Sequence, residues 1–336
     1  MAQVVIADSA DLIGSALDTL REAGATFRIL DEGLGDAELA TQAGDADVVL
    51  TVVRAIRRPV LERLQRVGLV VRCGIGVDLI DIDAASDLGI WVANVPDYCV
   101  EEVADQALML LLSAARQARH FELSWHEGRW ASLDYPAVRR LRGLTLGIVG
   151  LGRIGTQVAR RAPAFGLKVI ATDPYIPDER FSAVGARRVE MAELLASSDI
   201  ISLHLPLNGE TRHILDAGAF EAMKPGVVIV NVSRGGLIDT TALEAAVDGG
   251  QVAAVGIDVI EGEPAPDFSQ PLVGRRNVFM TPHVAWYSQD SRHELGILAA
   301  QEALRYLRGE SPRSPLNLAA RERATPAPPA SVEGSR

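Results

Sequence analysis

The amino-acid sequence predicts an α/β protein built from two Rossmann-like or flavodoxin-like parallel-sheet domains, with the active site in the cleft between them. Short β-branched runs alternate with amphipathic segments along most of the chain. A glycine-rich turn lies between an apolar run and a helical pattern near the middle of the chain. The 336 residues also suit two domains, at roughly 100–200 residues each.

Composition and charge exclude several classes of partner. The formal net charge is −11, and no Lys/Arg cluster with interleaved aromatic residues is present, so no nucleic-acid partner is expected. No apolar run approaches the ~20 residues of a membrane span, and no signal-peptide pattern opens the chain, which predicts a cytoplasmic protein without a membrane partner. Cys73 and Cys99 form no metal-ligand pattern, so we expect free thiols and no metal site.

The first α/β unit is expected to contain five strands, because five β-rich runs are separated by amphipathic stretches. The expected strands are 4–7, 25–30, 47–50, 69–72 and 90–92. A strongly apolar helix is predicted over 100–118, where it would lead into the second unit. Such a helix suits a domain or subunit junction.

Residues 143–173 predict a strand, a glycine-rich turn, a helix and a second strand that ends in an acid. Gly150 would allow the tight turn, Gly152 would let the backbone approach a pyrophosphate at the helix N-terminus, and Gly155 would let helix and strand pack closely. An ordinary glycine turn is the alternative, but the flanking strand and helix favour a dinucleotide. Because the Asp173 carboxylate would bind ribose hydroxyls and repel a 2′-phosphate, the predicted cofactor is NAD. The other residues of the turn are Leu151, Arg153 and Ile154.

The alternation resumes after this unit, with further strands expected over 199–203, 226–231, 253–258 and 277–280. The last helix, predicted over 288–308, begins once this sheet is complete and would return the chain to the first domain. We therefore expect one domain from residues 1–98 plus 288–318 and a second from 99–287. Residues 319–336 are rich in Pro, Ala and charge and are predicted to be a disordered tail.

Three later segments each offer polar groups directly after an expected strand. They are Asn-Val-Ser-Arg-Gly-Gly at 231–236, Asp-Val-Ile-Glu-Gly-Glu-Pro at 258–264 and Thr-Pro-His-Val-Ala-Trp at 281–286. Together with Gly-Leu-Gly-Arg-Ile-Gly at 150–155, they resemble the D-isomer-specific 2-hydroxyacid dehydrogenase family over residues 4–318. Within that family the chain looks like the C-terminal binding protein branch and its bacterial dehydrogenase relatives. The resemblance implies a substrate-binding (catalytic) domain at 1–98 plus 288–318 and an NAD-binding domain at 99–287.

The resemblance also implies three catalytic residues. Arg234 would hold the substrate carboxylate and carbonyl oxygen with its planar fork and polarise the C=O. His283 would be the general acid in reduction and the general base in oxidation. Glu263 would orient His283 and stabilise its imidazolium form, and it is preferred over Glu261 because the family places its acid directly before Pro.

The cofactor contacts implied by the resemblance come from several loops and one helix. Asp258 would face the nicotinamide carboxamide, whereas Val103 would lie under the nicotinamide ring and, taken alone, would be ordinary helix core. His204 is equally compatible with a purely structural role. The other implied contacts are Leu205, Pro206, Asn208, Thr211, Val232, Ser233, Arg234, His283, Ala285 and Trp286.

The implied substrate residues follow another strand, in the first unit. Backbone N–H groups of the glycine loop at Gly74, Ile75, Gly76 and Val77 would cradle the substrate carboxylate. Arg72 would join Arg234 in a cationic pocket, although an exposed strand-end charge is the alternative. Trp286 would form an aromatic wall or, alternatively, a domain-interface tryptophan. Arg54, Arg57 and Arg58 stand close enough to a strand end to reach a ligand, but a solvated surface cluster is the preferred interpretation.

The resemblance thus predicts an NAD-dependent D-2-hydroxyacid dehydrogenase that runs as a reductase of a small 2-oxo acid. It also implies, with the apolar helix over 100–118, a homodimer. One alternative is an NAD(H)-sensing scaffold or corepressor, because the C-terminal binding protein branch includes such proteins. Another is a dehydrogenase that acts on a phosphonate-bearing or other unusual anion, since relatives use such substrates.

Overall fold

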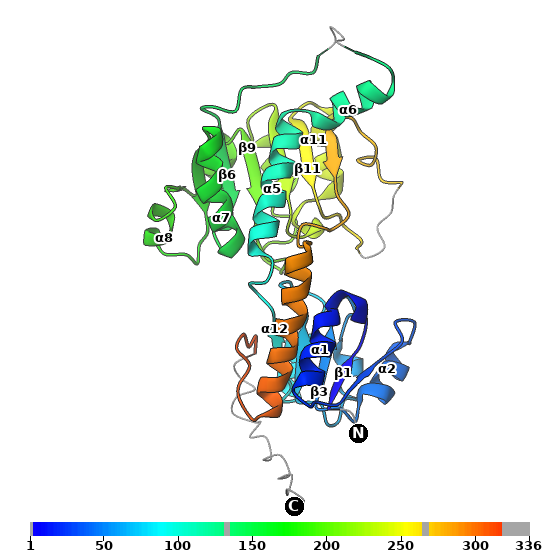
Figure 1. Ribbon diagram of the computed structural model, residues 1–336. Coiled ribbons are helices and arrows are strands. Elements are labelled where there is room, and N and C mark those ends of the chain that lie inside the picture. The colour runs from blue at the N-terminus through cyan, green and yellow to red at the C-terminus, as the bar shows by residue number, and fades with distance from the viewer. Residues whose placement is uncertain (1–2, 131–134, 264–268, 318–336) are drawn as a thin grey trace, which may run out of the picture. The chain divides into compact units, whose positions relative to one another are not determined.

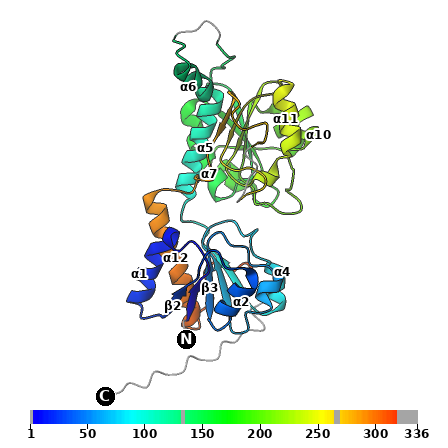
Figure 2. The ribbon, with the colours of Figure 1, turned by 90° about the vertical axis from the view of Figure 1, so that its right-hand side faces the viewer.

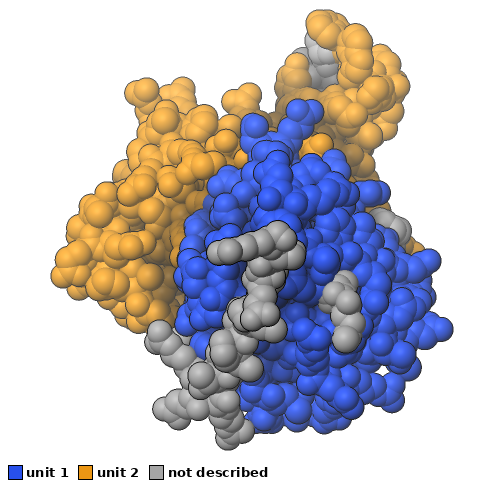
Figure 3. Space-filling model, turned by 60° about the horizontal axis from the view of Figure 1, so that its bottom comes forward, with its two compact units in different colours: residues 1–98, 288–336 blue, residues 99–287 orange. Residues whose placement is uncertain are grey.

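A computed structural model describes residues 3–130, 135–263 and 269–317. The chain forms two compact units, which Figure 3 distinguishes by colour. Unit 1 comprises the described parts of Met1–Tyr98 and Ser288–Arg336, and unit 2 runs from Cys99 to Tyr287. The tail predicted over 319–336 lies outside the described residues.

Unit 1 contains a parallel five-stranded sheet in the order β2-β1-β3-β4-β5. Its strands are β1 (Val4–Ile6), β2 (Phe27–Ile29), β3 (Val48–Thr51), β4 (Leu69–Arg72) and β5 (Trp91–Asn94). β1, β3 and most of β4 consist of buried β-branched and leucine residues, as expected for strands covered on both faces. The register pairs Thr51 with Arg72 and Arg72 with Asn94, so these three residues lie side by side at the carboxyl edge of the sheet.

Helices cover both faces of the unit 1 sheet. They are η1 (Ala10–Ile13), α1 (Gly14–Glu22), α2 (Asp36–Ala43), α3 (Arg58–Leu61), α4 (Ile82–Asp87) and α12 (Gln289–Leu307). α1 and α12 pack together on one face, and α2 and α4 lie on the other (Figure 2). Ser288 begins α12, because its side chain accepts the amide of Ser291 at 2.8 Å. Because α12 packs on α1, it belongs to unit 1, although it follows unit 2 in the sequence.

Unit 2 contains a parallel seven-stranded sheet in the order β12-β11-β10-β9-β6-β7-β8. Its strands are β6 (Thr145–Val149), β7 (Lys168–Thr172), β8 (Arg187–Arg188), β9 (Ile200–Leu203), β10 (Val227–Asn231), β11 (Val252–Ile257) and β12 (Val278–Met280). The strand order reverses between β6 and β9, and ligands of such sheets bind at this switch point, outside the carboxyl ends of the strands.

Helices also cover both faces of this sheet, with α5 and α7 on one side and α10 and α11 on the other (Figures 1 and 2). The helices are α5 (Val100–Ala115), α6 (Ala118–His126), α7 (Arg153–Arg161), η2 (Ala162–Phe165), α8 (Asp178–Ser182), α9 (Met191–Ser197), α10 (Ala217–Glu221), η3 (Gly235–Leu237) and α11 (Thr240–Asp248). Among the described residues, none of the helices is long and apolar enough to cross a bilayer.

One local prediction from the sequence is wrong, and one short strand was missed. The helix predicted over 100–118 ends at Ala115, because Gln117 adopts a left-handed backbone with φ of 54° and a separate helix, α6, begins at Ala118. The side chain of Gln117 donates to the carbonyl of Ala253 at 3.3 Å, which stabilises the break. The short edge strand β8 was not predicted, since its two arginines are exposed and carry no apolar pattern. Cys73 and Cys99 are both buried and form no disulfide with each other, as predicted.

Candidate active site

The polar segments singled out in the sequence follow the carboxyl ends of strands of the unit 2 sheet. The segment at 150–155 follows β6, Asp173 follows β7, 204–211 follows β9, 231–236 follows β10, 258–263 follows β11 and 281–286 follows β12. Because all these strands are parallel, the segments emerge at one edge of the sheet. The fold thereby gathers residues that lie far apart in the sequence.

The glycine turn is tightly packed at two of its three glycines. Gly150 has φ of 94°, and a Cβ there would lie 2.6 Å from the carbonyl oxygen of His204, across the switch point. A Cβ at Gly155 would lie 2.1 Å from the carbonyl oxygen of Gly150. A Cβ at Gly152 would meet nothing within 4 Å. The sequence thus needs glycine at 150 and 155 to fold, whereas the space beside Gly152 is left open.

The turn fits a dinucleotide by its hydrogen-bonding groups. α7 begins after Gly152 with no side chain capping its first turn, so its N-terminal amides can donate hydrogen bonds to an anion. Asp173 is fixed beside the turn, because its carboxylate accepts the amides of Leu151 at 2.9 Å and Tyr175 at 3.0 Å. The donor set and the open side of Gly152 therefore suit a pyrophosphate, with a carboxylate placed for a ribose hydroxyl.

The loop after β9 is shaped mainly by its own hydrogen bonds. Nε2 of His204 lies 2.9 Å from the Ser202 hydroxyl, while its buried Nδ1 has no hydrogen-bond partner among the described residues. Burial lowers the pKa of His204 to about 4, so its ring is neutral near pH 7. The Asn208 side chain accepts the amide of Thr211 at 3.0 Å, and the Thr211 hydroxyl donates to the carbonyl of Pro206 at 2.7 Å.

The turn that carries Arg234 is held by its neighbours. Buried Asn231 donates to the carbonyl of Arg234 at 2.8 Å and accepts the amide of Ser233 at 3.0 Å. The Ser233 hydroxyl donates to the carbonyl of Leu203 at 2.9 Å, which joins this turn to the end of β9. Val232, between Asn231 and Ser233 in the sequence, is buried. Arg234 is half-buried and donates to the carbonyl of Ser233 at 2.8 Å.

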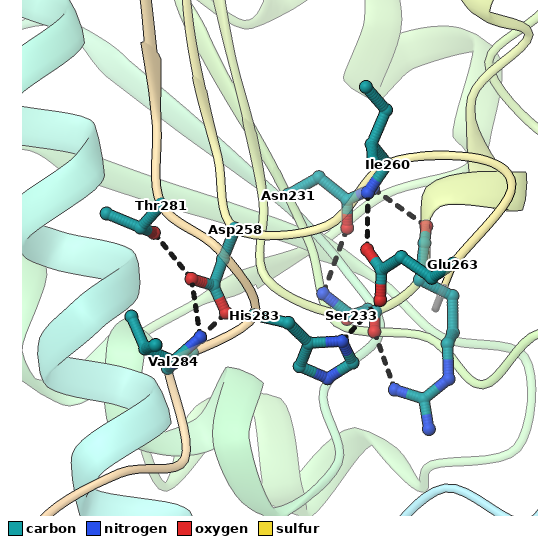
Figure 4. Close-up of polar contacts among 10 residues, drawn as sticks. Asn231, Ser233, Asp258, Ile260, Glu263, Thr281, His283 and Val284 are labelled. Carbon is teal, nitrogen blue, oxygen red and sulfur yellow. Dashed lines mark hydrogen bonds and ion pairs between the residues drawn. The ribbon is translucent and has the colours of Figure 1, made fainter. Parts of the chain in front are cut away.

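Asp258 is buried and holds the turn that carries His283 (Figure 4). Its carboxylate accepts the amides of Val284 at 3.0 Å and Ala285 at 2.8 Å and the hydroxyl of Thr281. Burial raises its pKa above the ordinary value of 3.8, although these hydrogen bonds oppose the shift. Both carboxylate oxygens of Asp258 therefore have partners within the chain. The implied contact of Asp258 with the nicotinamide carboxamide stays a prediction.

The Thr281 hydroxyl also accepts the side-chain amide of Gln106 at 3.0 Å, so α5 is tied to the same network. The sequence analysis did not single out Gln106, because it belongs to no motif and is one of several polar residues in α5. Val103, one turn earlier in α5, is buried.

His283 and Glu263 are in hydrogen-bonding contact through Nδ1 of the ring and Oε2 of the carboxylate (Figure 4). The other carboxylate oxygen of Glu263 accepts the amide of Ile260 at 2.7 Å. His283 has a left-handed backbone with φ of 54°, and its amide donates to the carbonyl of Asp258 at 2.8 Å. Glu261 faces elsewhere and contacts Nε2 of His213 at 2.8 Å. The structure therefore places Glu263, and not Glu261, on His283.

The remaining residues of the last segment differ in exposure. Ala285 is buried, and Trp286 is half-buried with its ring edge-on to Tyr287 at a centroid distance of 5.6 Å.

Within the described parts of the chain, no group of three or more His, Cys, Asp or Glu residues is arranged to hold a metal.

In unit 1 the loop after β4 is held by β5. The side chain of Asn94 donates to the carbonyl of Ile75 at 2.7 Å, and the amide of Val95 donates to the carbonyl of Gly74 at 3.1 Å. Gly74 has φ of 146° and lies so close to Arg72 that a Cβ would stand 1.8 Å from its Nη1. Arg72 is half-buried and donates to the carbonyl of Cys73, while Gly76 and Val77 are half-buried.

The interpretation of Arg54 as a solvated residue is wrong. Its side chain is only 14% exposed and donates to the carbonyl of Leu34. The reason is Asp8, a buried carboxylate after β1 that accepts the amides of Val52 and Val53 and draws the loop onto the sheet edge. Arg58, by contrast, is exposed and pairs with Asp87 at 2.7 Å, and Arg57 is exposed too.

These features define the class of doubly wound, dinucleotide-binding α/β proteins, with a histidine–glutamate pair at the carboxyl edge of the nucleotide sheet. The chain belongs to the D-isomer specific 2-hydroxyacid dehydrogenase family, because residues 108–285, more than half of its length, match the NAD binding domain of that family. The family, the fold class and NAD as the cofactor, all predicted from the sequence, are thereby confirmed.

Three similar proteins illustrate the relationship. D-3-phosphoglycerate dehydrogenase of Methanocaldococcus jannaschii is 38% identical over 322 residues, which are 95% of this chain and 60% of that protein. Hydroxypyruvate reductase of Blautia hydrogenotrophica is 37% identical over 287 residues, covering 84% of this chain and 87% of that protein. The crystal structure of a glyoxylate reductase from Paecilomyes thermophila superposes with a TM-score of 0.85 at 31% identity, covering 94% of this chain and 98% of that one.

The chain spans less than two thirds of the length of the D-3-phosphoglycerate dehydrogenases that it matches, 57% and 60% in two cases. The resemblance to the C-terminal binding protein branch stays a prediction, as does the cytoplasmic location.

Proposed function

We propose that the chain is an NAD-dependent D-2-hydroxyacid dehydrogenase that reduces a small 2-oxo acid. The observation that carries this proposal is the His283–Glu263 pair at the carboxyl edge of the NAD-binding sheet. β10, the strand that leads to Arg234, lies beside β11, the strand that leads to Glu263. An acid–base group and a planar cation are the two elements that reduction of a 2-oxo acid requires of the protein.

The contacts of His283 assign its ring nitrogens. Because Glu263 holds Nδ1, Nε2 is the nitrogen that can give a proton to the substrate oxygen in reduction and remove it in oxidation. Glu263 fixes the ring orientation and stabilises the imidazolium form. Arg234 is proposed to bind the carboxylate and to polarise the carbonyl group of the substrate. NAD, when bound, supplies or accepts the hydride.

The experiment is to measure NADH oxidation against a panel of 2-oxo acids. The panel runs from glyoxylate and pyruvate through branched, aromatic and dicarboxylate acids to phosphonate-bearing ones. Hydroxypyruvate and glyoxylate are the first substrates to test, because two similar proteins are a hydroxypyruvate reductase and a glyoxylate reductase. Turnover that is lost in both His283→Ala and Arg234→Ala supports the proposal. Tight NADH binding without turnover of any acid contradicts it and favours an NAD(H)-sensing scaffold.

We also propose that the chain forms a homodimer through the outer side of α5 and α6. Trp125 and Trp130 are 62% and 80% exposed, and their rings pack edge to face with their centroids 5.6 Å apart. An apolar groove beside α5 is lined by Leu108, Met109 and Phe165. Exposed apolar surface of this kind typically marks a protein interface. Sedimentation equilibrium tests the proposal: twice the chain mass supports it, and a monomer at micromolar concentration contradicts it.

A further inference from the structure

Glu261, two residues before Glu263, is held by a set of contacts of its own. One carboxylate oxygen lies 2.8 Å from Nε2 of His213, and the other accepts the hydroxyl of Thr240 at 2.8 Å. Arg212 approaches to 3.5 Å. The side chains of His213 and Glu261 are 34% and 26% exposed, so this pair is better shielded than an ordinary surface ion pair. Burial pulls the pKa of Glu261 upward, but the bonds from His213 and Thr240 outweigh it and keep the pKa low.

His213 is joined to the turn that carries Arg234 through its backbone. Its amide donates to the carbonyl of Gly236 at 2.8 Å, two residues beyond Arg234. Its φ of 51° is left-handed, a conformation that side chains other than those of Gly, Asn, Asp and His rarely adopt. A residue held in such a conformation is one that its surroundings fix strongly, and such residues concentrate at functional sites.

The segment that carries Glu261 and Glu263 packs directly on the same turn. A Cβ at Gly235 would lie 2.1 Å from the carbonyl carbon of Ile260, so the two backbones are in close contact. The amide of Ile260 in turn donates to Glu263 at 2.7 Å. A shift of Glu261 would therefore be transmitted over two residues to the carboxylate that holds His283.

We propose that His213 and Glu261 are positioning residues: their contact fixes the segment 260–263 against the Arg234 turn and so sets the place from which Glu263 holds His283. The inference rests on the proposed dehydrogenase function. His213 bonds to one of the two loops through its backbone and to the other through its ring. The alternative is a merely structural pair, whose loss would lower stability without changing the chemical step.

The first test is His213→Asn in the full-length chain, with NADH and the best 2-oxo acid of the panel. Asn tolerates the left-handed backbone but is too short to reach Glu261. We expect kcat to fall about tenfold, because a small misplacement of a catalytic group is costly, while the Kd of NADH changes less than about twofold. Glu261→Gln, which keeps the shape of the side chain, should lower kcat in the same way if His213→Asn fails to fold.

The matched control is Arg187→Asn. Arg187 also pairs with a glutamate, Glu193, at 2.6 Å, but that pair is exposed and joins β8, the edge strand of the unit 2 sheet, to α9. Its substitution should leave kcat unchanged. Equal losses of kcat in the two variants would overturn the inference.

A double variant distinguishes a positioning role of His213 from a merely structural role, because residues that act through one another lose activity non-additively. If His213 acts through Glu263, His213→Asn should cost little further activity in a Glu263→Gln background, whereas independent effects would multiply. Hydrogen exchange of the chain without ligands should also show faster exchange over residues 259–263 in His213→Asn. The inference is overturned if the two activity losses multiply in the double variant, or if hydrogen exchange over residues 259–263 is unchanged in His213→Asn. If the wild type turns over no 2-oxo acid, the proposed function fails, and the exchange result alone decides whether the pair fixes the segment.

Discussion

Glu263 links His283 to the loop after β11, because one carboxylate oxygen contacts Nδ1 of the ring while the other accepts the amide of Ile260 at 2.7 Å. The backbone of His283 is fixed independently, since its amide donates to the carbonyl of Asp258 at 2.8 Å. Side chain and backbone of His283 are thus both held by the segment that follows β11, at two separate points. A ring anchored in this way keeps Nε2 in one direction, as a proton donor requires.

Glu263→Gln is expected to lower kcat about 100-fold, within the range that general acid–base catalysis contributes. Gln keeps an oxygen for the amide of Ile260 but loses the charge that stabilises the imidazolium form. The Kd of NADH, measured by fluorescence titration, should change less than about threefold. Glu193→Gln, which removes a charge from an exposed pair with Arg187, is the control. An unchanged kcat in Glu263→Gln would remove Glu263 from the mechanism.

Asp258→Asn is expected to lower the free energy of unfolding by about 1–3 kcal/mol, the cost of leaving a buried group unpaired. The Asp258 carboxylate accepts two backbone amides and a hydroxyl, and the NH₂ group of Asn cannot accept any of them. Urea denaturation measures the change. Asp248→Asn removes a charge from an exposed pair with Arg275 and should cost much less stability than Asp258→Asn. Equal stabilities of the two variants would show that the Asp258 network contributes nothing.

The parallel sheets could be predicted because their strands are runs of β-branched residues buried on both faces. The glycine turn could be placed because its residues are local to one another in sequence. Partners that are distant in sequence left no such signal: the contact of Asp8 with residues 52–53 buries Arg54, and the contact of Gln117 with Ala253 ends α5 early. The His213–Glu261 contact joins residues 48 positions apart and was likewise not predicted.

Stability is expected to depend on pH through His204. Burial lowers its pKa from 6.5 to about 4 in the folded chain, so between these values the unfolded chain binds a proton that the folded chain does not. Stability should therefore fall as the pH falls through this window, by up to about 3 kcal/mol between about pH 7 and pH 4. His204→Gln should lack this component, whereas His126→Gln, at an exposed site, should retain it. The prediction is contradicted if the free energy of unfolding depends on pH in the same way in the wild type and in His204→Gln.

Gly152→Ala and Gly155→Ala separate the binding role of the glycine turn from its folding role. A Cβ at Gly152 meets nothing within 4 Å, so Gly152→Ala should leave the Tm of the chain without NADH nearly unchanged. The same methyl group would occupy the space proposed for the pyrophosphate, and the Kd of NADH should rise roughly tenfold or more. Gly155→Ala places its methyl group 2.1 Å from the carbonyl oxygen of Gly150 and should lower both the Tm and the affinity. If Gly152→Ala binds NADH as tightly as the wild type, the pyrophosphate does not lie beside Gly152.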